Sequence, residues 1–404
     1  MLDRTRILEL LNRTSADYTL PQAFYRDEDL YEFDVSAVLG RSWMMIGFEA
    51  ELPETGSYLA VTVGRSPVMV VRGRDGVIRG FHNTCRHRGS QICADGHGRS
   101  IKLMCPYHKW TYDLDGRLIG AARMSPDFRA ADHALRTIPV ETLEGCIYIA
   151  LSDDAPDFSP FRSAVAPLLA PYNMAEAKVA FSSTLIEKAN WKLVMENARE
   201  CYHCAACHPE LKLSYPVGVG RDSGASEYNR AFAARMEKMG LSTAPVEALW
   251  WHAERYALNP GMESISMDGK PAVRRRLVSI EAADIGAFWW ATEPNNFCHA
   301  FSDYAFMFSA MPSAPQETRV ISKWLVHKDA VEGVDYTIES LIEAWTKTNL
   351  QDRELAENNQ RGVNGLGYAP GPYSQEAEDY VVRFAKWYRE VARAAAQGPG
   401  FPPA

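Results

Sequence analysis

Two histidines and a carboxylate lie close together in the segment from Asn190 to Pro209, NWKLVMENARECYHCAACHP. His203 and His208 are five residues apart, and Glu200 precedes the first histidine by three residues. Two imidazoles and one carboxylate can hold non-haem ferrous iron and leave coordination positions open. This segment therefore predicts a mononuclear iron site around which the rest of the chain is organised.

A second group of metal ligands comes earlier in the chain, on two short loops. The first loop contains Cys85-Arg-His87 and the second contains Cys105-Pro-Tyr-His108. Two thiolates and two imidazoles would satisfy a structural zinc ion. They would also satisfy a Rieske cluster, in which two histidines replace two cysteines on one of the two irons. Each loop contributes one cysteine and one histidine, and this mixed order favours the two-iron cluster over zinc.

The composition is typical of a globular enzyme. The chain has 404 residues, enough for two or three domains, with 47% hydrophobic and 23% charged residues. A net charge of −8 argues against nucleic acid or an anionic membrane as partner. No apolar run is long enough to span a bilayer, and the charged N-terminus predicts an amphipathic helix rather than a signal peptide. We therefore expect a cytoplasmic protein whose eight cysteines are reduced thiols or metal ligands.

Three regions must position these ligands. We expect residues 1–40 to form a helical segment that packs on the catalytic domain. Residues 41–155 contain short β-type runs, such as SYLAVTV and PVMVVRG, separated by glycine turns, and they predict an all-β domain that carries both cysteine–histidine loops. A stretch rich in proline and aspartate marks its end. Residues 156–404 mix strands with helices, so the expected fold class is α+β.

The last region should place the histidine pair on a helix that follows a strand over residues 178–191. A spacing of three residues predicts that Asn197, Glu200 and His203 share one helical face. The helix is expected to loosen or end between the two histidines. Residues 211–285 show no clear period and predict loops and a lid, after which strands return between residues 288 and 328.

A long helix is expected from about Asp335 to Gln360. Asp352 lies seven residues after Trp345, on the inward face of that helix. A buried carboxylate needs a partner, and its position alone leaves a metal ion and a buried ion pair as equal alternatives.

With these motifs in place, the chain resembles the oxygenase (α) subunits of Rieske non-haem iron oxygenases over nearly its whole length. The two cysteine–histidine loops match the cluster motif, and Asn197, His203 and His208 match the helix that binds the mononuclear iron. The resemblance implies a Rieske domain followed by a helix-grip catalytic domain, in which helices cover an antiparallel sheet. It also implies that the third iron ligand is Asp352 rather than Asp303 or Asp335.

Glu200 departs from the family, which usually has Asp at this position. That carboxylate typically bridges the two metal centres of neighbouring subunits. Glu here, together with phrases such as FHNTCRHRGS and WLVHKDAVEGVDY, is similar to the branch that acts on quaternary ammonium compounds, which includes stachydrine demethylase, glycine betaine monooxygenase and carnitine oxygenase.

The resemblance implies a [2Fe-2S] cluster, mononuclear Fe(II) and O₂ as co-substrate. NAD(P)H would act only through a separate reductase, because the chain has no Gly-x-Gly-x-x-Gly after a strand. It further implies a homotrimer that N-demethylates a small betaine and releases formaldehyde. A quaternary ammonium group is attracted to aromatic faces, and the candidates for such a cage are Trp251, Trp290, Phe301, Tyr304 and Phe306. The partner of the substrate carboxylate stays open among Arg274–Arg276, Asn295 and Asn296.

Two other functions remain open from the sequence. One is an aromatic-ring-hydroxylating dioxygenase, which would use the same metal centres. The other is a non-enzymatic protein that uses the cysteine–histidine loops for electron transfer or for binding zinc. Analysis of iron and acid-labile sulfide would separate the enzyme from the zinc protein.

Overall fold

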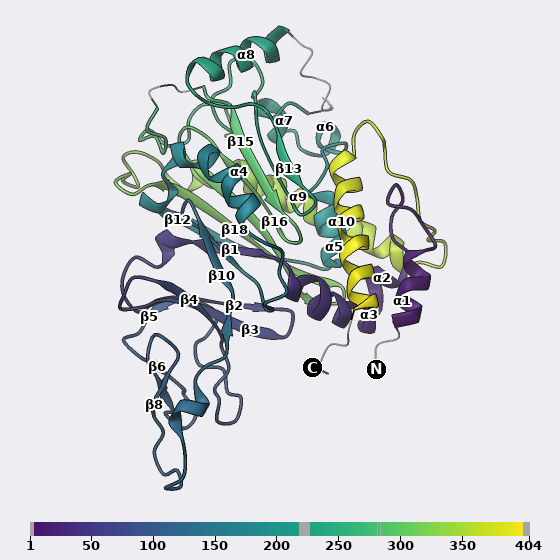
Figure 1. Ribbon diagram of the computed structural model, residues 1–404. Coiled ribbons are helices and arrows are strands. Elements are labelled where there is room, and N and C mark those ends of the chain that lie inside the picture. The colour runs from purple at the N-terminus through teal and green to yellow at the C-terminus, as the bar shows by residue number, and fades with distance from the viewer. Residues whose placement is uncertain (1–3, 218–226, 281, 283, 399–404) are drawn as a thin grey trace.

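The computed structural model describes residues 4–217, 227–280, 282 and 284–398 (Figure 1). Within these ranges the strands form four sheets. A β-rich lobe that contains β2 to β8 projects from a larger body built around a seven-stranded sheet (Figure 1). None of the helices in the described ranges has the length and apolarity that crossing a bilayer requires.

The β-rich lobe holds a five-stranded antiparallel sheet and a smaller three-stranded one. The first has the order β5-β2-β3-β4-β9 and the second the order β6-β7-β8. The strands are β2 (Ser57–Val63), β3 (Ser66–Arg72), β4 (Ile78–His82), β5 (Gly96–Arg99), β6 (Leu103–Met104), β7 (Thr111–Tyr112), β8 (Leu118–Gly120) and β9 (Thr137–Ile138).

Side-chain alternation gives the five-stranded sheet two different faces. Leu59 and Val70 point into the main core that the lobe shares with the larger body. Ala60, Met69 and Val71 point the other way, into the small core beneath the cysteine–histidine loops. Because successive side chains of a strand point to opposite faces, one sheet both attaches the lobe and supports its loops.

A three-stranded sheet joins the lobe to the larger body. It has the order β1-β11-β10 and consists of β1 (Met44–Phe48), β10 (Val140–Leu143) and β11 (Cys146–Ile149). The Met45 carbonyl accepts a hydrogen bond from Ser309 Oγ at 3.1 Å, so β1 lies directly against the seven-stranded sheet.

The larger body confirms the expected α+β class. Its sheet is antiparallel throughout, with the order β12-β18-β17-β16-β15-β14-β13. The strands are β12 (Ala177–Glu187), β13 (Val246–Ala248), β14 (Trp251–Tyr256), β15 (Ala287–Thr292), β16 (Asn296–Ala300), β17 (Ala305–Ala314) and β18 (Glu317–His327). One face packs with α5 (Trp191–Asn197), α9 (Ile338–Asn364) and α10 (Asp379–Gln397), and the other with α4 (Ser159–Leu169) and α8 (Glu227–Lys238).

The expectation that residues 211–285 form only loops and a lid is wrong for the described part of that segment. It contains α8, β13 and β14. The polar composition of α8 hides an apolar pair, Phe232 and Met236, which are spaced by one helical turn and buried. The strand β14 lies near the edge of the sheet, where it pairs with both β13 and β15.

The N-terminal segment contains α1 (Arg4–Leu11), α2 (Ala23–Arg26) and α3 (Glu28–Phe33), beside α10 (Figure 1). Asp34 anchors this segment from a fully buried position. Its carboxylate accepts hydrogen bonds from Trp191 Nε1 at 3.1 Å, from Tyr388 OH at 2.7 Å and from the ammonium group of Lys192. A buried charge is tolerated only when it is paired in this way.

Candidate metal centres

The two cysteine–histidine loops have the same backbone hydrogen-bond pattern. In each loop the cysteine N–H donates to the carbonyl five residues later, and the cysteine carbonyl accepts from the N–H four residues later, at 2.8 to 3.1 Å. Each loop closes through a residue with positive φ, Gly89 at 77° and Lys109 at 61°. The matching turns bring the side chains of Cys85 and Cys105 close enough to interact with each other.

The donor atoms divide between the inside and the surface of the lobe. Cys85 and Cys105 are buried, whereas His87 and His108 are exposed, with ring centroids 4.6 Å apart. Burial raises the pKa of the Cys105 thiol, but backbone N–H groups outweigh that effect and lower it overall. Two buried sulfurs beside two exposed imidazoles fit a Rieske cluster, with one iron held inside and the other near solvent.

Neighbouring side chains hold the two imidazoles in place. The ring of His87 stacks on Trp110 with centroids 4.8 Å apart. Arg88 Nη2 lies 2.7 Å from Nε2 of His108, and the same guanidinium lies over the Tyr107 ring. Desolvation and the Arg88 charge lower the pKa of His108, which favours the neutral imidazole that a metal requires.

The candidate iron ligands meet at a single point. His203 Nε2 and His208 Nε2 are 2.9 Å apart, and Asp352 Oδ1 is 3.2 Å from the first and 3.0 Å from the second. Donors bonded at about 2.1 Å and at right angles around one ion lie about 3.0 Å apart. The triangle therefore has the size of one face of an octahedron, and the donor set fits a ferrous ion with its other positions open.

The electrostatics of this triangle also suit a cation. Burial disfavours a charged His203, but the carboxylates of Asp352 and Glu200 outweigh burial and raise its pKa to about 10. Burial lowers the pKa of His208 and Asp352 raises it, and the pKa is raised overall. In return, the two histidines more than offset burial and lower the pKa of Asp352. The site thus demands positive charge, which an iron ion would supply in place of protons.

The structure corrects the expected helix around the histidines. The helix α5 ends at Asn197, and the histidines flank a separate short helix, α6 (Cys204–Cys207), so Asn197, Glu200 and His203 do not share one helical face. The Glu200 carboxylate accepts hydrogen bonds from the backbone N–H groups of Tyr202 and His203, in the turn that precedes α6. A new helical turn therefore begins where a continuous helix was predicted.

Glu200 also contacts the iron ligand directly. Its Oε1 lies 2.5 Å from Nδ1 of His203, and the side chain is only 12% exposed. Both carboxylate oxygens therefore have partners within their own subunit. The role of Glu200 as a bridge to a neighbouring subunit stays a prediction, as does the supporting role of Asn197.

The helix α9 places Asp352 by two contacts with the sheet. Trp345 Nε1 donates to Tyr304 OH at 2.9 Å, and Asn349 Nδ2 donates to Ser322 Oγ at 3.0 Å. Trp345 lies about two helical turns before Asp352 and Asn349 about one turn before it. All three side chains therefore lie on the side of α9 that faces the core. The alternative of a plain buried ion pair is disfavoured because the partners of Asp352 are two imidazoles that also face each other.

Sequence analysis missed one neighbour of the iron ligands. Gln351 Oε1 lies 2.8 Å from Nδ1 of His208. Its position directly before Asp352 was the available indication, but only the fold places its side chain against His208.

The cysteines of this segment are not all reduced, contrary to expectation. Cys201 and Cys204 form a disulfide that brackets His203 in the sequence. The Cys204 sulfur lies within 4.8 Å of the ligand nitrogens of His203 and His208. Because that sulfur is bonded to Cys201, it does not compete with Asp352 as third ligand.

The five aromatic cage candidates lie on two different faces of the large sheet. Phe301, Tyr304 and Phe306 are in the core on the side of α9. Trp251 and Trp290 belong to the core on the opposite side, which packs with α4 and α8. The structure therefore does not bring these two tryptophans together with the iron ligands, and they are removed from the candidate cage.

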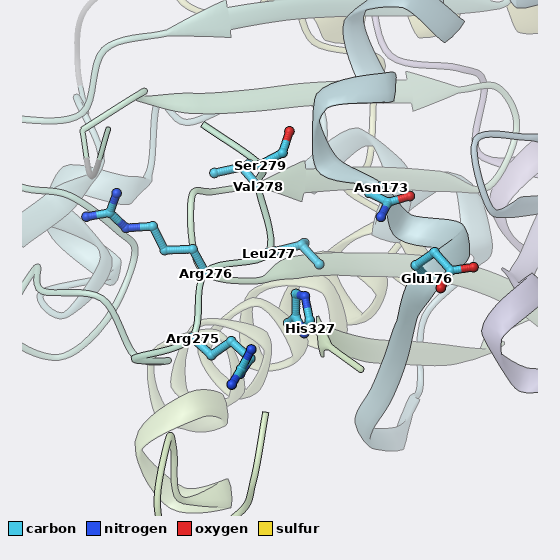
Figure 2. A pocket seen from close by; sticks show the side chains of 8 residues that line it. All are labelled: Asn173, Glu176, Arg275, Arg276, Leu277, Val278, Ser279 and His327. Atoms are coloured by element: carbon cyan, nitrogen blue, oxygen red, sulfur yellow. The ribbon is translucent and has the colours of Figure 1, made fainter. Parts of the chain in front are cut away.

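The candidates for binding the substrate carboxylate lie elsewhere. Arg275 and Arg276 line a pocket together with His327, at the end of β18 (Figure 2). The other end of the β12–β18 ladder contains Glu187. Burial and the charge of Asp352 raise the pKa of Glu187 to about 8, so this end of the ladder lies near the iron ligands. Asn295 and Asn296 are buried, and their side chains bond to Ser309 and Thr292 within the sheet.

Comparison with known proteins supports both metal centres. Residues 42–140 match the Rieske [2Fe-2S] domain, and residues 174–394 match the ring hydroxylating alpha subunit (catalytic domain). The chain is 40% identical over 405 residues to the glycine betaine monooxygenase oxygenase subunit of Chromohalobacter salexigens, covering 98% of this chain and 91% of that protein. It is also 40% identical to the subunit of that name from Pseudomonas aeruginosa strain UCBPP-PA14, covering 96% and 92%.

The fold is shared with a solved structure. The quaternary ammonium Rieske monooxygenase CntA, in complex with an inhibitor, superposes with a TM-score of 0.73 at 21% identity. The match covers 95% of this chain and 97% of CntA.

Proposed function

This chain belongs to the family of Rieske non-haem iron oxygenase α subunits, and on that basis we propose that it N-demethylates a small betaine. As a member of that family it is an oxidoreductase with a [2Fe-2S] cluster and a mononuclear iron, in an enzyme whose electrons come from a reductase. The alternative of a non-enzymatic zinc or electron-transfer protein is therefore wrong.

One observation supports the substrate class above all others. The proteins that are 40% identical over nearly the whole chain are oxygenase subunits of glycine betaine monooxygenase. Glycine betaine and stachydrine are our leading substrates, since both combine a quaternary ammonium group with a carboxylate.

The chain's own residues divide the chemistry between the two centres. Cys85, Cys105 and their two histidines would hold the cluster, which supplies single electrons. His203, His208 and Asp352 would hold the iron, which activates O₂ when it is bound. A site with only three protein donors would leave the coordination positions that O₂ activation beside the substrate methyl group requires. Glu200 accepts a hydrogen bond from Nδ1–H of His203 and keeps that imidazole oriented.

The proposed reaction balances in two steps. The substrate N-methyl group takes one atom of O₂ and becomes N-hydroxymethyl, while two electrons and two protons convert the other atom to water. The N-hydroxymethyl group then loses a proton from oxygen, its C–N bond breaks, and formaldehyde leaves from the tertiary amine.

We assign recognition of the cation to the cluster of aromatic rings on the α9 side of the sheet, in the core that also contains the elements carrying the iron ligands. Phe306 stacks on Trp345 with centroids 4.3 Å apart, and Phe301 contacts Tyr304 at 4.9 Å. His299 lies against Trp345 in the same cluster, and burial lowers its pKa to about 3. A neutral imidazole does not repel a quaternary ammonium group, and the aromatic faces attract it.

The proposal is tested by turnover with the reconstituted reductase system. Glycine betaine, stachydrine, carnitine and choline are supplied separately, and formaldehyde and O₂ uptake are measured together. We expect formaldehyde in proportion to O₂ with at least one of the first two. Naphthalene and biphenyl serve as controls for ring hydroxylation. Hydroxylated aromatic products without formaldehyde from any betaine would replace the proposal with the dioxygenase function.

A further inference from the structure

The two histidines of the iron triangle have different partners on their outer nitrogens. Nδ1 of His203 faces the Glu200 carboxylate at 2.5 Å. Nδ1 of His208 faces the Gln351 side-chain amide at 2.8 Å. His208 is also the more deeply buried of the two, with 1% of its side chain exposed against 16% for His203.

The orientation of the Gln351 amide follows from its second partner. Gln351 Nε2 lies 3.1 Å from Oε2 of Glu210. An ionised carboxylate only accepts hydrogen bonds, so the amide nitrogen must face Glu210 and the amide oxygen must face His208. The amide oxygen in turn accepts, so Nδ1 of His208 carries the proton. In the neutral imidazole that a metal ion requires, Nε2 of His208 then carries the lone pair, on the side of Asp352 and His203.

A second residue of α9, Lys347, also contacts Glu210. Lys347 Nζ lies 3.8 Å from Oε1 of Glu210 and 3.0 Å from Oε1 of Glu343. Lys347 precedes Gln351 by one turn of α9, so both contacts of Glu210 come from one face of one helix. The side chain of Glu210 is 21% exposed, which leaves its charge in contact with solvent.

We propose that Gln351, oriented by Glu210, is a positioning residue that presents His208 to the iron as a neutral Nε2 ligand. The inference rests on the proposed iron centre, although not on the identity of the substrate. A carboxylate partner makes an imidazole more basic, whereas an amide fixes its tautomer with little added charge. His203 and His208 are therefore unequal donors, and the amide is the cause.

The charge of the site gives a reason for the amide. A ferrous ion carries two positive charges, and Asp352 and Glu200 supply two negative ones beside it. A carboxylate in place of the Gln351 amide would add a third negative charge, and the group formed by the iron, Asp352, Glu200 and residue 351 would be net negative. With Gln351 the site stays neutral, while the orienting hydrogen bond is kept.

The first test removes the hydrogen bond. Gln351→Ala is compared with wild type for iron retained against a ferrous chelator, with each sample normalised to its cluster absorption. We expect iron affinity to fall about 10- to 100-fold, the usual cost of losing an orienting partner of a metal ligand. Leu350→Ala, an exposed neighbour on α9, is the matched control and should retain iron like wild type.

The second test exchanges the acid and the amide. The double variant Gln351→Glu/Glu210→Gln keeps a donor and an acceptor at every contact but places a carboxylate on His208. We expect it to retain iron far better than Gln351→Ala, and to change the electron paramagnetic resonance spectrum of the ferrous site with nitric oxide as probe. The spectrum reports the ligand field and does not depend on turnover.

The outcomes separate this inference from the proposed function. Wild-type iron retention in Gln351→Ala, or an unaltered nitrosyl spectrum in the double variant, would overturn the role of Gln351. If Gln351→Ala does not fold, the spectrum of the double variant decides alone. Neither result depends on formaldehyde, so a failure of betaine turnover in wild type would count only against the proposed substrate.

Discussion

Acidification should destabilise this protein through a single buried histidine. His299 is 5% exposed, and its Nδ1 lies 3.0 Å from Tyr256 OH. Its ring lies 5.0 Å from that of Trp345, on the helix that carries Asp352. Burial lowers the pKa of His299 from 6.5 to about 3. Between these two values the unfolded chain binds a proton that the folded chain does not.

The sign and size of the effect follow from that difference. A base with a lowered pKa stabilises the fold fully above pH 6.5, and its contribution is lost as the pH falls toward 3. Relative to pH 7.5, His299 should reduce the free energy of unfolding by about 2 kcal/mol at pH 5 and by about 4 kcal/mol at pH 3.

The perturbation is the double variant His299→Phe/Tyr256→Phe, which removes the titrating ring together with the hydroxyl that bonds to it. Urea unfolding is followed by tryptophan fluorescence at pH 7.5 and pH 5.0. The loss of stability between the two pH values should be about 2 kcal/mol smaller in the variant than in wild type. An equal loss in the double variant and wild type would refute the assignment of acid sensitivity to His299.

Three further predictions concern the metal centres. Cys85→Ser or His108→Ala should abolish the visible absorption of the Rieske cluster while the far-ultraviolet circular dichroism of the larger body persists, and absorption that survives would exclude the altered residue as a ligand. Asp352→Ala should lose most of its mononuclear iron and its turnover but keep the cluster spectrum, because two histidines alone hold ferrous iron weakly; full activity would return Asp352 to a structural ion pair. Glu200→Gln should keep both metals and a trimer by light scattering, yet slow single-turnover oxidation of the pre-reduced cluster, and wild-type speed or an active monomer would remove the bridge between subunits.

The candidate metal ligands could be read from the sequence because their spacing is local. Cys85 with His87 and Cys105 with His108 lie within single turns, and the backbone of each turn fixes their relation. His203 and His208 are separated by only one short helix. The local segment therefore largely determines that the two histidines lie close together. The α+β class also follows from local patterns, those of the strands and helices.

The tertiary structure alone decided what lies across from those ligands. Asp352 is 149 residues from His203, and Gln351 is 143 residues from His208. Helical periodicity placed Asp352 on an inward face but could not show which partner it meets.

The same limit applies to the aromatic candidates. Every residue of β15 and the first eight residues of β17 are buried. A strand covered on both faces has no alternation of polar and apolar residues, so its sequence cannot show which ring faces which layer. Trp290 and Phe306 are both buried aromatic residues of central strands, and they were indistinguishable in the sequence. They lie on opposite faces because α9 covers one side of the sheet and α4 the other, which only the packing of the whole chain determines.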